Sequence, residues 1–410
     1  MTTRFALLVA LFCALAAATT PVPASSGGFC DNADLRASAE DLHQVPPDLT
    51  QFGSAVAISG LTAMVGLPNY FVNPETTPGP QGRVAIFTCD LQTRTWSRVG
   101  SLDPQDPAEE ELFFGTAIAL QGHQAVIGSQ NAVRLYEERH GNWRQVLKLQ
   151  ANGADEFIEP RIAYDRPYLA VIRAKVVAEQ VMRFIDVYRV GEGRRATLVA
   201  RLHPPGDFGP LALDEGTLVA GTFVYTKRDG KWRLQQEIAP DEAPPPDSDF
   251  GSVVAIRRNI LLVGSPREDR IVGDEGPTGG GAVYVFERRK GNWRQVQRIR
   301  PGTAGFDGFG SSLALNEHHA AVGAPGALGG FGREFGPTFL YRVGAGGLTF
   351  DSTLDDVIAT SMDMSRRDLI VGTSTVVQGS PITRAVIVRL PLLHGVAEAA
   401  EEEGRSDADE

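Results

Sequence analysis

The sequence predicts an all-β fold, a seven-bladed β-propeller of four-stranded antiparallel blades. A unit of about 50 residues recurs along the chain. Each copy contains four short runs of alternating or β-branched residues separated by turn residues, which is typical of four strands. The hexapeptide GNWRQV, present at Gly141–Val146 and Gly291–Val296, shows the repeat most plainly. Such units favour a radial array of small sheets.

The repeat has seven copies, five of them strong and two, at residues 157 and 357, weaker. The copies begin near Phe52, Phe114, Phe157, Phe208, Phe250, Phe309 and Val357. Six intervals therefore span 305 residues, from 52 to 357, or about 51 residues each. We label the four strands of each copy A to D in chain order.

Two residue types recur at fixed places in the unit. The start of strand D holds every tryptophan of the protein: Trp96, Trp143, Trp232 and Trp293. One ring per blade predicts packing between blades instead of a shared binding cleft. The corners of the unit hold glycines that predict crowding of the inner strands: Gly53, Gly66, Gly264 and Gly323.

These corners carry a family resemblance. The stretches FGSAVAISG…VGLP, FGSVVAI…VGSP and FGSSLAL…VGAP resemble FG-GAP repeats, the blade motif of the integrin-alpha N-terminal propeller and of many secreted bacterial proteins. The resemblance covers Phe52 to about Leu390 and implies a seven-bladed propeller used in adhesion or protein interaction. Some integrin-like A–B turns carry an Asp-x-Asp-x-Asp-Gly calcium loop. No A–B turn of this sequence has that pattern, so no metal and no other cofactor is expected.

The first residues resemble an export signal. Arg4 precedes the apolar stretch Phe5–Ala18, and small residues follow. Residues 1–24 are expected to be a signal peptide, cleaved after Ala18 or Ala24, with a signal anchor as the alternative. No later segment is long and apolar enough to cross a membrane. The mature chain is expected to be exported to the extracellular or periplasmic space and to be a monomer.

Cysteine and charge content limit the possibilities further. Cys30 and Cys89 remain after the signal; an oxidising compartment permits a disulfide, but the sequence leaves their pairing open. The net charge is −11, and the tail, residues 396–410, holds seven acids and one arginine. That tail is expected to be a disordered, solubilising end. The charge of about −5 that remains argues against a nucleic-acid partner.

The ring formed by residues 52–395 needs a closing strand. The seventh unit ends with RAVIVRLPLL and has strands A to C but no D. The N-terminal segment, residues 25–51, includes the stretch Ala33–Gln51 in the place of a strand D. We predict that this segment supplies the missing outer strand as a clasp, because an open array would leave sheet edges exposed.

Strand alternation sorts the connections onto two faces. A–B and C–D turns share one face, and B–C and D–A loops share the other. The long insertions are B–C loops, and loops on a rigid scaffold often carry function. Their mixture of aromatic and charged residues suits a protein interface. The candidate ligand-binding residues are Tyr70, Phe71, Arg267, Asp269, Arg270, Phe331, Arg333 and Phe335. Alternatively, the aromatic residues pack onto their own loops.

No arrangement of residues indicates catalysis, so no catalytic residue is assigned. Near the axis the strand A beginnings offer only Glu159 and Arg161, which we expect to form an ion pair. We therefore predict a non-catalytic scaffold that binds a protein or cell-surface component through the B–C/D–A loop face. The alternative is a carbohydrate-binding or carbohydrate-active hydrolase or lyase, with a loop-cup site whose candidate carboxylates are Asp269, Asp274 and Glu334.

Overall fold

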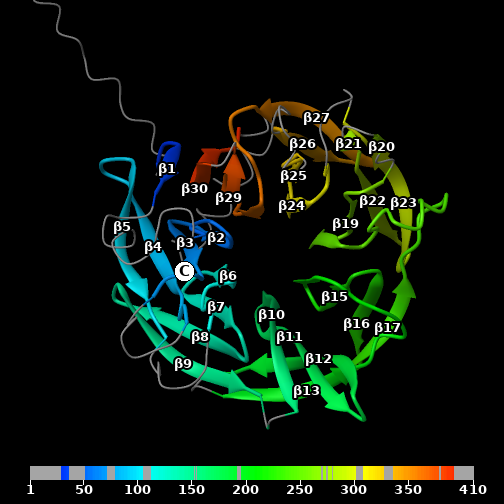
Figure 1. Cartoon of the computed structure of the whole chain (residues 1–410), viewed down its shortest axis with the longest axis horizontal. Coiled ribbons are helices and arrows are strands. Elements are labelled where there is room, and N and C mark those ends of the chain that lie inside the picture. The colour runs from blue at the N-terminus through cyan, green and yellow to red at the C-terminus, as the bar shows by residue number, and fades with distance from the viewer. Residues whose placement is uncertain are drawn as a thin grey trace, which may run out of the picture.

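The computed structural model is a seven-bladed propeller, as predicted. It describes residues 29–36, 51–71, 79–104, 112–151, 153, 155–191, 195–268, 271–273, 276–278, 280–301, 308–326, 336–377 and 380–391. Seven four-stranded antiparallel sheets surround a common axis (Figure 1). The first strands of successive blades contact one another around this axis.

The first six blades each use strands that follow one another in the chain. Blade 1 contains β2 (Val56–Ser59), β3 (Thr62–Leu67), β4 (Arg83–Asp90) and β5 (Thr95–Leu102). Blade 2 contains β6 (Ala117–Gln121), β7 (Gln124–Ser129), β8 (Ala132–Arg139) and β9 (Asn142–Gln150). Blade 3 contains β10 (Glu156–Asp165), β11 (Tyr168–Val177), β12 (Gln180–Val190) and β13 (Ala196–Leu202).

Blade 5 differs by a short hairpin inserted between its second and third strands. Blade 4 contains β14 (Leu211–Asp214), β15 (Thr217–Ala220), β16 (Phe223–Arg228) and β17 (Lys231–Glu237). Blade 5 contains β18 (Val253–Arg257), β19 (Ile260–Ser265), β22 (Ala282–Arg289) and β23 (Asn292–Ile299), with the inserted β20 (Ile271–Gly273) and β21 (Gly276–Thr278). Blade 6 contains β24 (Ser312–Leu315), β25 (His319–Gly323), β26 (Thr338–Gly344) and β27 (Gly347–Leu354).

Short A–B turns join the inner strands because their residues accept positive φ angles. In blade 4, Asp214 pairs with Thr217, which leaves a two-residue turn. The turn residues Glu215 and Gly216 have φ angles of 44° and 73°. Two-residue hairpins with this twist require positive φ at both positions, which explains the glycine and polar residues of these turns.

The core is divided among the blade interfaces. Seven clusters of buried apolar residues occur, one between each pair of neighbouring blades. The tryptophans lie in four different clusters, Trp96 between blades 7 and 1 and Trp293 between blades 4 and 5, for example. The rings do not converge on one pocket, so the prediction that they pack between blades is confirmed. Full burial of a large apolar side chain stabilises the fold by about 1.5–3 kcal/mol.

The predicted crowding of the inner strands is present at the corner glycines. A Cβ added to Gly66 would lie 2.2 Å from the carbonyl oxygen of Gly115 in the next blade. The equivalent Gly264 of blade 5 would place a Cβ 2.3 Å from the oxygen of Gly310. Real Cβ atoms do not approach a carbonyl so closely, so only glycine lets these blades meet.

The N-terminal segment closes the ring, as predicted. Blade 7 contains β28 (Ser361–Met364), β29 (Asp368–Val377), β30 (Ser380–Arg389) and, as its outer strand, β1 (Ala33–Leu35). β1 runs antiparallel to β30, with Asp34 opposite Val386. The described strand is shorter than the segment predicted for it, and residues 37–50 lie outside the described part of the chain.

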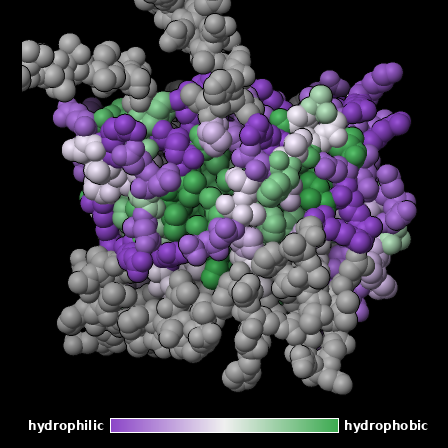
Figure 2. Space-filling view, turned by 90° about the horizontal axis from the view of Figure 1, so that it is seen from above, coloured by the Kyte–Doolittle hydropathy of each residue, from purple (hydrophilic) through white to green (hydrophobic). Residues whose placement is uncertain are grey.

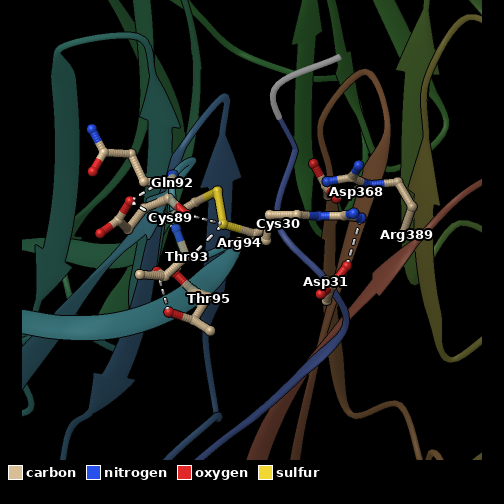
Figure 3. Close-up of a disulfide and its surroundings, with 10 residues drawn as sticks. Cys30, Asp31, Cys89, Gln92, Thr93, Arg94, Thr95, Asp368 and Arg389 are labelled. Atoms are coloured by element: carbon tan, nitrogen blue, oxygen red, sulfur yellow. Dashed lines mark hydrogen bonds and ion pairs between the residues drawn. A yellow bond between two sulfur atoms is a disulfide. The ribbon is translucent and has the colours of Figure 1, made fainter. Parts of the chain in front are cut away.

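A disulfide fastens this clasp to blade 1. Cys30, just before β1, bonds to Cys89 of β4 with a Cα–Cα distance of 5.8 Å (Figure 3). Next to it, Arg94 and Asp31 form an ion pair at 2.7 Å. The pairing that the sequence left open is therefore formed in the structure, and it ties the N-terminal strand to the first blade.

The rim of the propeller is mixed in polarity. Figure 2 shows it from above Figure 1, with apolar side chains in the middle of the described surface and hydrophilic ones on both sides. One large apolar ring on the rim is Phe350 of β27, which is 56% exposed and packs edge-on against Tyr341. Scattered apolar residues of this kind are normal on a protein surface.

Candidate binding faces of the propeller

Among the predicted loop residues, Tyr70 packs onto its own blade. Its side chain is 3% exposed and belongs to the core cluster between blades 7 and 1. The guanidinium carbon of Arg83 lies 4.0 Å from the centre of the Tyr70 ring. Arg83 in turn forms two hydrogen bonds with Asp103, at 2.6 and 2.8 Å. For Tyr70, the alternative that the aromatic residue packs down therefore holds.

The other predicted residues fall into two groups. Phe71 is half-buried, and Arg267 is exposed, with its guanidinium 3.0 Å from the Asp249 carboxylate. These two remain on the surface of the loop face. The remaining candidates lie outside the residues whose side chains the structure describes: Asp269, Arg270, Phe331, Arg333 and Phe335, together with the carboxylates Asp274 and Glu334.

The predicted ion pair of Glu159 and Arg161 exists, but Arg183 of β12 is the closer partner. Arg161 lies 3.9 Å from Glu159. Arg183 donates two hydrogen bonds to the same carboxylate, at 2.7 and 2.8 Å, and one to the Phe208 carbonyl at 2.9 Å. The hydrogen bond with Glu159 raises the pKa of Arg183. The sequence could not place Arg183 here, because its position depends on cross-strand pairing.

An acid in blade 5, Glu268, also has its interactions within its own blade. Glu268 is buried, its carboxylate accepts a hydrogen bond from the Tyr284 hydroxyl at 2.7 Å, and Arg298 pairs with it. Burial opposes the charged form, but the hydrogen bonds from Tyr284 and Arg298 hold the pKa of Glu268 below its ordinary value. A permanently ionised, buried carboxylate of this kind holds a loop in place and is a poor general acid.

The sequence did not single out the exposed apolar residues of the blade 3 hairpin. β11 and β12 form a long hairpin that continues to the pair Val177 and Gln180. Near its tip Val181 is 63% exposed and Met182 is 52% exposed. Val177 and, on β10, Phe157 are also exposed. We call these four residues the blade 3 tip. Because β11 ends and β12 begins there, the tip lies on the B–C/D–A loop face.

At the opposite end of the axis, a cavity of about 460 Å³ opens where the A–B turns meet. All seven blades line it. One polar residue near the end of each inner strand contributes to its wall: Ser59, Gln121, Asp165, Asp214, Arg257, Asn316 and Asp363. We call these seven residues the axial belt. In the sequence, the residues of these turns indicated tight turns only, and this arrangement was not predicted.

Hydrogen bonds of the axial belt connect each blade to the next. Ser59 accepts one from the backbone N–H of Gly122 at 2.9 Å, and Asp165 accepts one from that of Glu215 at 2.8 Å. The other links are Gln121 to Arg166, Asp214 to Arg258, Arg257 to Glu317, and Asn316 to Ser365. The belt therefore satisfies turn backbone groups that the small A–B loops cannot satisfy themselves.

Asp363 makes the belt's contact across the closing interface. Its carboxylate accepts a hydrogen bond of 2.8 Å from the backbone N–H of Ile58 in blade 1. Burial raises the pKa of Asp363, against the hydrogen bonds from Ile58 and Met364, which lower it. Six blades have alanine at this strand position: Ala57, Ala119, Ala163, Ala212, Ala255 and Ala314. In the seventh repeat, SMDMS (Ser361–Ser365), aspartate replaces this alanine. That difference from the other repeats could have pointed to Asp363 in the sequence.

No group of three or more His, Cys, Asp or Glu side chains that could hold a metal ion occurs among the residues that the structure describes. Within the same residues, no helix has the length and apolar character needed to span a membrane.

Comparison with known proteins identifies the repeat. A family model described as FG-GAP repeat matches residues 232–286, which run from the outer strand of blade 4 to the third strand of blade 5. No curated protein matches the chain.

Two solved structures resemble the chain. One, from Bacteroides uniformis ATCC 8492, is described as a "putative 6-phosphogluconolactonase"; it is 12% identical, covers 78% of this chain and 88% of its own, and has a TM-score of 0.47. The other is a protein from Lactobacillus plantarum, 12% identical, covering 81% and 97%, with a TM-score of 0.49. These scores carry no argument about activity. Together, the sheets and the matched repeat show that the chain is a seven-bladed β-propeller containing an FG-GAP repeat.

Proposed function

We propose that the protein is an exported, non-catalytic scaffold that binds a protein or a cell-surface component through its B–C/D–A loop face. The observation that carries this proposal is the blade 3 tip. Four large apolar side chains there are at least 40% exposed, on one hairpin and the inner strand beside it. Strand alternation places Phe157 and Val181 on one face of the hairpin and Val177 and Met182 on the other, so the end of the hairpin presents exposed apolar side chains on both faces. Such a density favours an interaction site more than single exposed residues do.

Two acids of the loop face support binding over catalysis. Glu159 is held by Arg183, and Glu268 is held by Tyr284 and Arg298. A general acid or base needs a proton to exchange near the working pH, which an arginine-paired carboxylate does not have. The disulfide between Cys30 and Cys89 supports export, because disulfides persist in oxidising compartments.

Affinity capture from native culture fluid or cell envelope tests the proposal. The variant Val181→Ser with Met182→Ser removes two exposed apolar side chains of the tip. Its matched control is Leu198→Ser with Val199→Ser, an adjacent exposed pair on β13, at the rim of the same blade. We expect the tip variant to bind the captured component about 10-fold or more weakly, as for residues near an interface centre, and the control to bind like the parent protein.

Two results would contradict the proposal. Equal capture by the tip variant and the rim control would show that the blade 3 tip on the loop face does not contribute to binding. Turnover of a carbohydrate in a hydrolase and lyase panel would favour the carbohydrate-active alternative, provided that it is lost when Asp269, Asp274 or Glu334 is replaced.

A further inference from the structure

The A–B face of blade 7 carries three arginines, of which one is paired with an acid in the described part of the chain. Arg366 and Arg367 lie in the turn between β28 and β29, and Arg389 is the last residue of β30. Arg366 is exposed and lines the mouth of the axial cavity. Within the part of the chain that the structure describes, its side chain has no hydrogen bond or ion pair. We call Arg366, Arg367 and Arg389 the arginine cluster.

The surroundings of the cluster supply too little negative charge. Asp368 binds Arg389 at 2.7 Å. Arg367 and Arg389 both stack on the ring of Phe29, at 4.1 and 4.6 Å from its centre. Burial and repulsion from Arg366 and Arg389 lower the pKa of Arg367, and they outweigh the attraction of Asp368, which raises it. By contrast, the direct hydrogen bond with Glu159 raises the pKa of Arg183.

The nearby acids are already engaged. Glu317 of blade 6 pairs with Arg257 and with Arg258, both at 2.9 Å. Asp363 accepts the backbone hydrogen bond from Ile58 that links blade 7 to blade 1. Among the described residues only Arg389 of the cluster has a carboxylate partner, Asp368, so Arg366 and Arg367 can still bind carboxylates. Bidentate pairing with arginine is among the stronger interactions a carboxylate makes.

The chain itself has a suitable segment close by. The backbone N–H of Leu390 donates to the carbonyl of Arg367 at 2.8 Å, so β30 ends directly beside the cluster. Seven residues beyond Pro391, the last described residue, begins Glu398–Glu410, with seven acids and one arginine. Seven residues can span at most about 23–25 Å, and such a short tether raises the effective concentration to about millimolar.

We propose that the acidic segment Glu398–Glu410 binds back to the arginine cluster at the mouth of the axial cavity. Charge complementarity supplies the attraction, and the position of Leu390 brings the segment to the right face. The arginine cluster is on the A–B face, so binding of the segment there leaves the B–C/D–A loop face open. This inference does not depend on the proposed function of the loop face.

Fluorescence energy transfer within the mature, oxidised chain tests the proposal. One dye is placed at Ser406→Cys and the other at Leu61→Cys, an exposed A–B turn residue of blade 1. A second pair combines Ser406→Cys with Val181→Cys on the loop face. We expect high transfer only for the first pair at low salt, and its loss near 1 M salt, where the screening length falls to about 3 Å.

Charge reversal tests which residues hold the segment. Arg366→Glu with Arg367→Glu should abolish the high transfer. The matched control, Arg228→Glu with Lys231→Glu in the C–D turn of blade 4, makes the same charge change on the same face and should leave the transfer unchanged. Because Arg367 stacks on Phe29, a third variant leaves the blades intact: Glu401→Gln, Glu402→Gln and Glu403→Gln together should reduce the transfer as well.

Three results would overturn the proposal. One is transfer that is unchanged by Arg366→Glu with Arg367→Glu. Another is equal loss in the blade 4 control, which would mean attraction to the whole face. The third is transfer between singly labelled copies mixed in solution at the level of the doubly labelled chain, which would assign the contact to a second molecule.

Discussion

The interface between blades 4 and 5 and the one between blades 7 and 1 close the same ring by different means. Blades 4 and 5 follow each other in the chain, and a buried apolar cluster with Trp293 and the Asp214 contacts is enough to join them. Blades 7 and 1 lie at opposite ends of the chain. They add a borrowed strand and the Cys30–Cys89 bond. These extra links lie at the interface where the loop-closure entropy is largest.

The largest effect is expected at the disulfide. Cys30→Ala with Cys89→Ala should lower the free energy of unfolding by about 4 kcal/mol, because the bond closes a loop between residues 59 positions apart. Urea unfolding of the oxidised parent and of the variant measures it. Reduction of the parent protein serves as the control and should give a similar loss. A loss below about 1 kcal/mol would mean that the clasp holds without covalent help.

A smaller effect is expected from Asp214 at the interface between blades 4 and 5. Asp214 is buried and accepts hydrogen bonds from the Arg257 guanidinium and the backbone N–H of Arg258. Asp214→Ala should cost about 1.5–3 kcal/mol, because both donors lose a charged acceptor. Thermal and urea unfolding measure the change. Asp241→Ala, exposed just after β17 of the same blade, is the matched control and should change little. An equal cost in both variants would argue against a stabilising role of the belt contacts of Asp214.

The smallest effect is expected at Asp363, where removal of the charge should raise the free energy of unfolding instead of lowering it. The pKa of Asp363 in the fold is raised above the ordinary value of 3.8. Between pH 3.8 and that raised pKa, the folded state therefore binds more protons than the unfolded state. Stability from this group therefore falls as the pH rises through that window. Asp363→Asn keeps an acceptor for Ile58 N–H without the charge, so it should equal the parent protein below pH 3.8 and exceed it at neutral pH.

Unfolding measured from pH 3 to 8 tests this expectation. Asp363→Ala makes blade 7 like the other six blades but removes the acceptor, and it should cost about 1 kcal/mol at low pH. A parent protein that gains stability relative to Asp363→Asn as the pH rises would show that Asp363 is stabilised as the carboxylate, contrary to the expectation.

Much of the fold could be predicted because repeats make local signals add up. The recurring Phe-Gly corners and the tryptophans at one position indicated seven similar sheets, and the missing strand D of the seventh unit indicated the clasp. The candidate site was less accessible. Tyr70 and Phe71 are adjacent in the sequence, but Tyr70 is buried beneath Arg83 and Phe71 is only half-buried. Loop sequence alone does not show which side of a loop faces the core.

The sequence by itself determined the number of blades, the turns between inner strands and the need for a closing strand, because these depend on periodicity and on residues such as glycine that permit one local geometry. Only the tertiary structure decided which side chains meet. The pairing of Arg183 with Glu159, the exposed blade 3 tip and the belt across seven turns all join residues from different strands or blades. Such contacts depend on register and ring closure, which short-range sequence patterns do not encode.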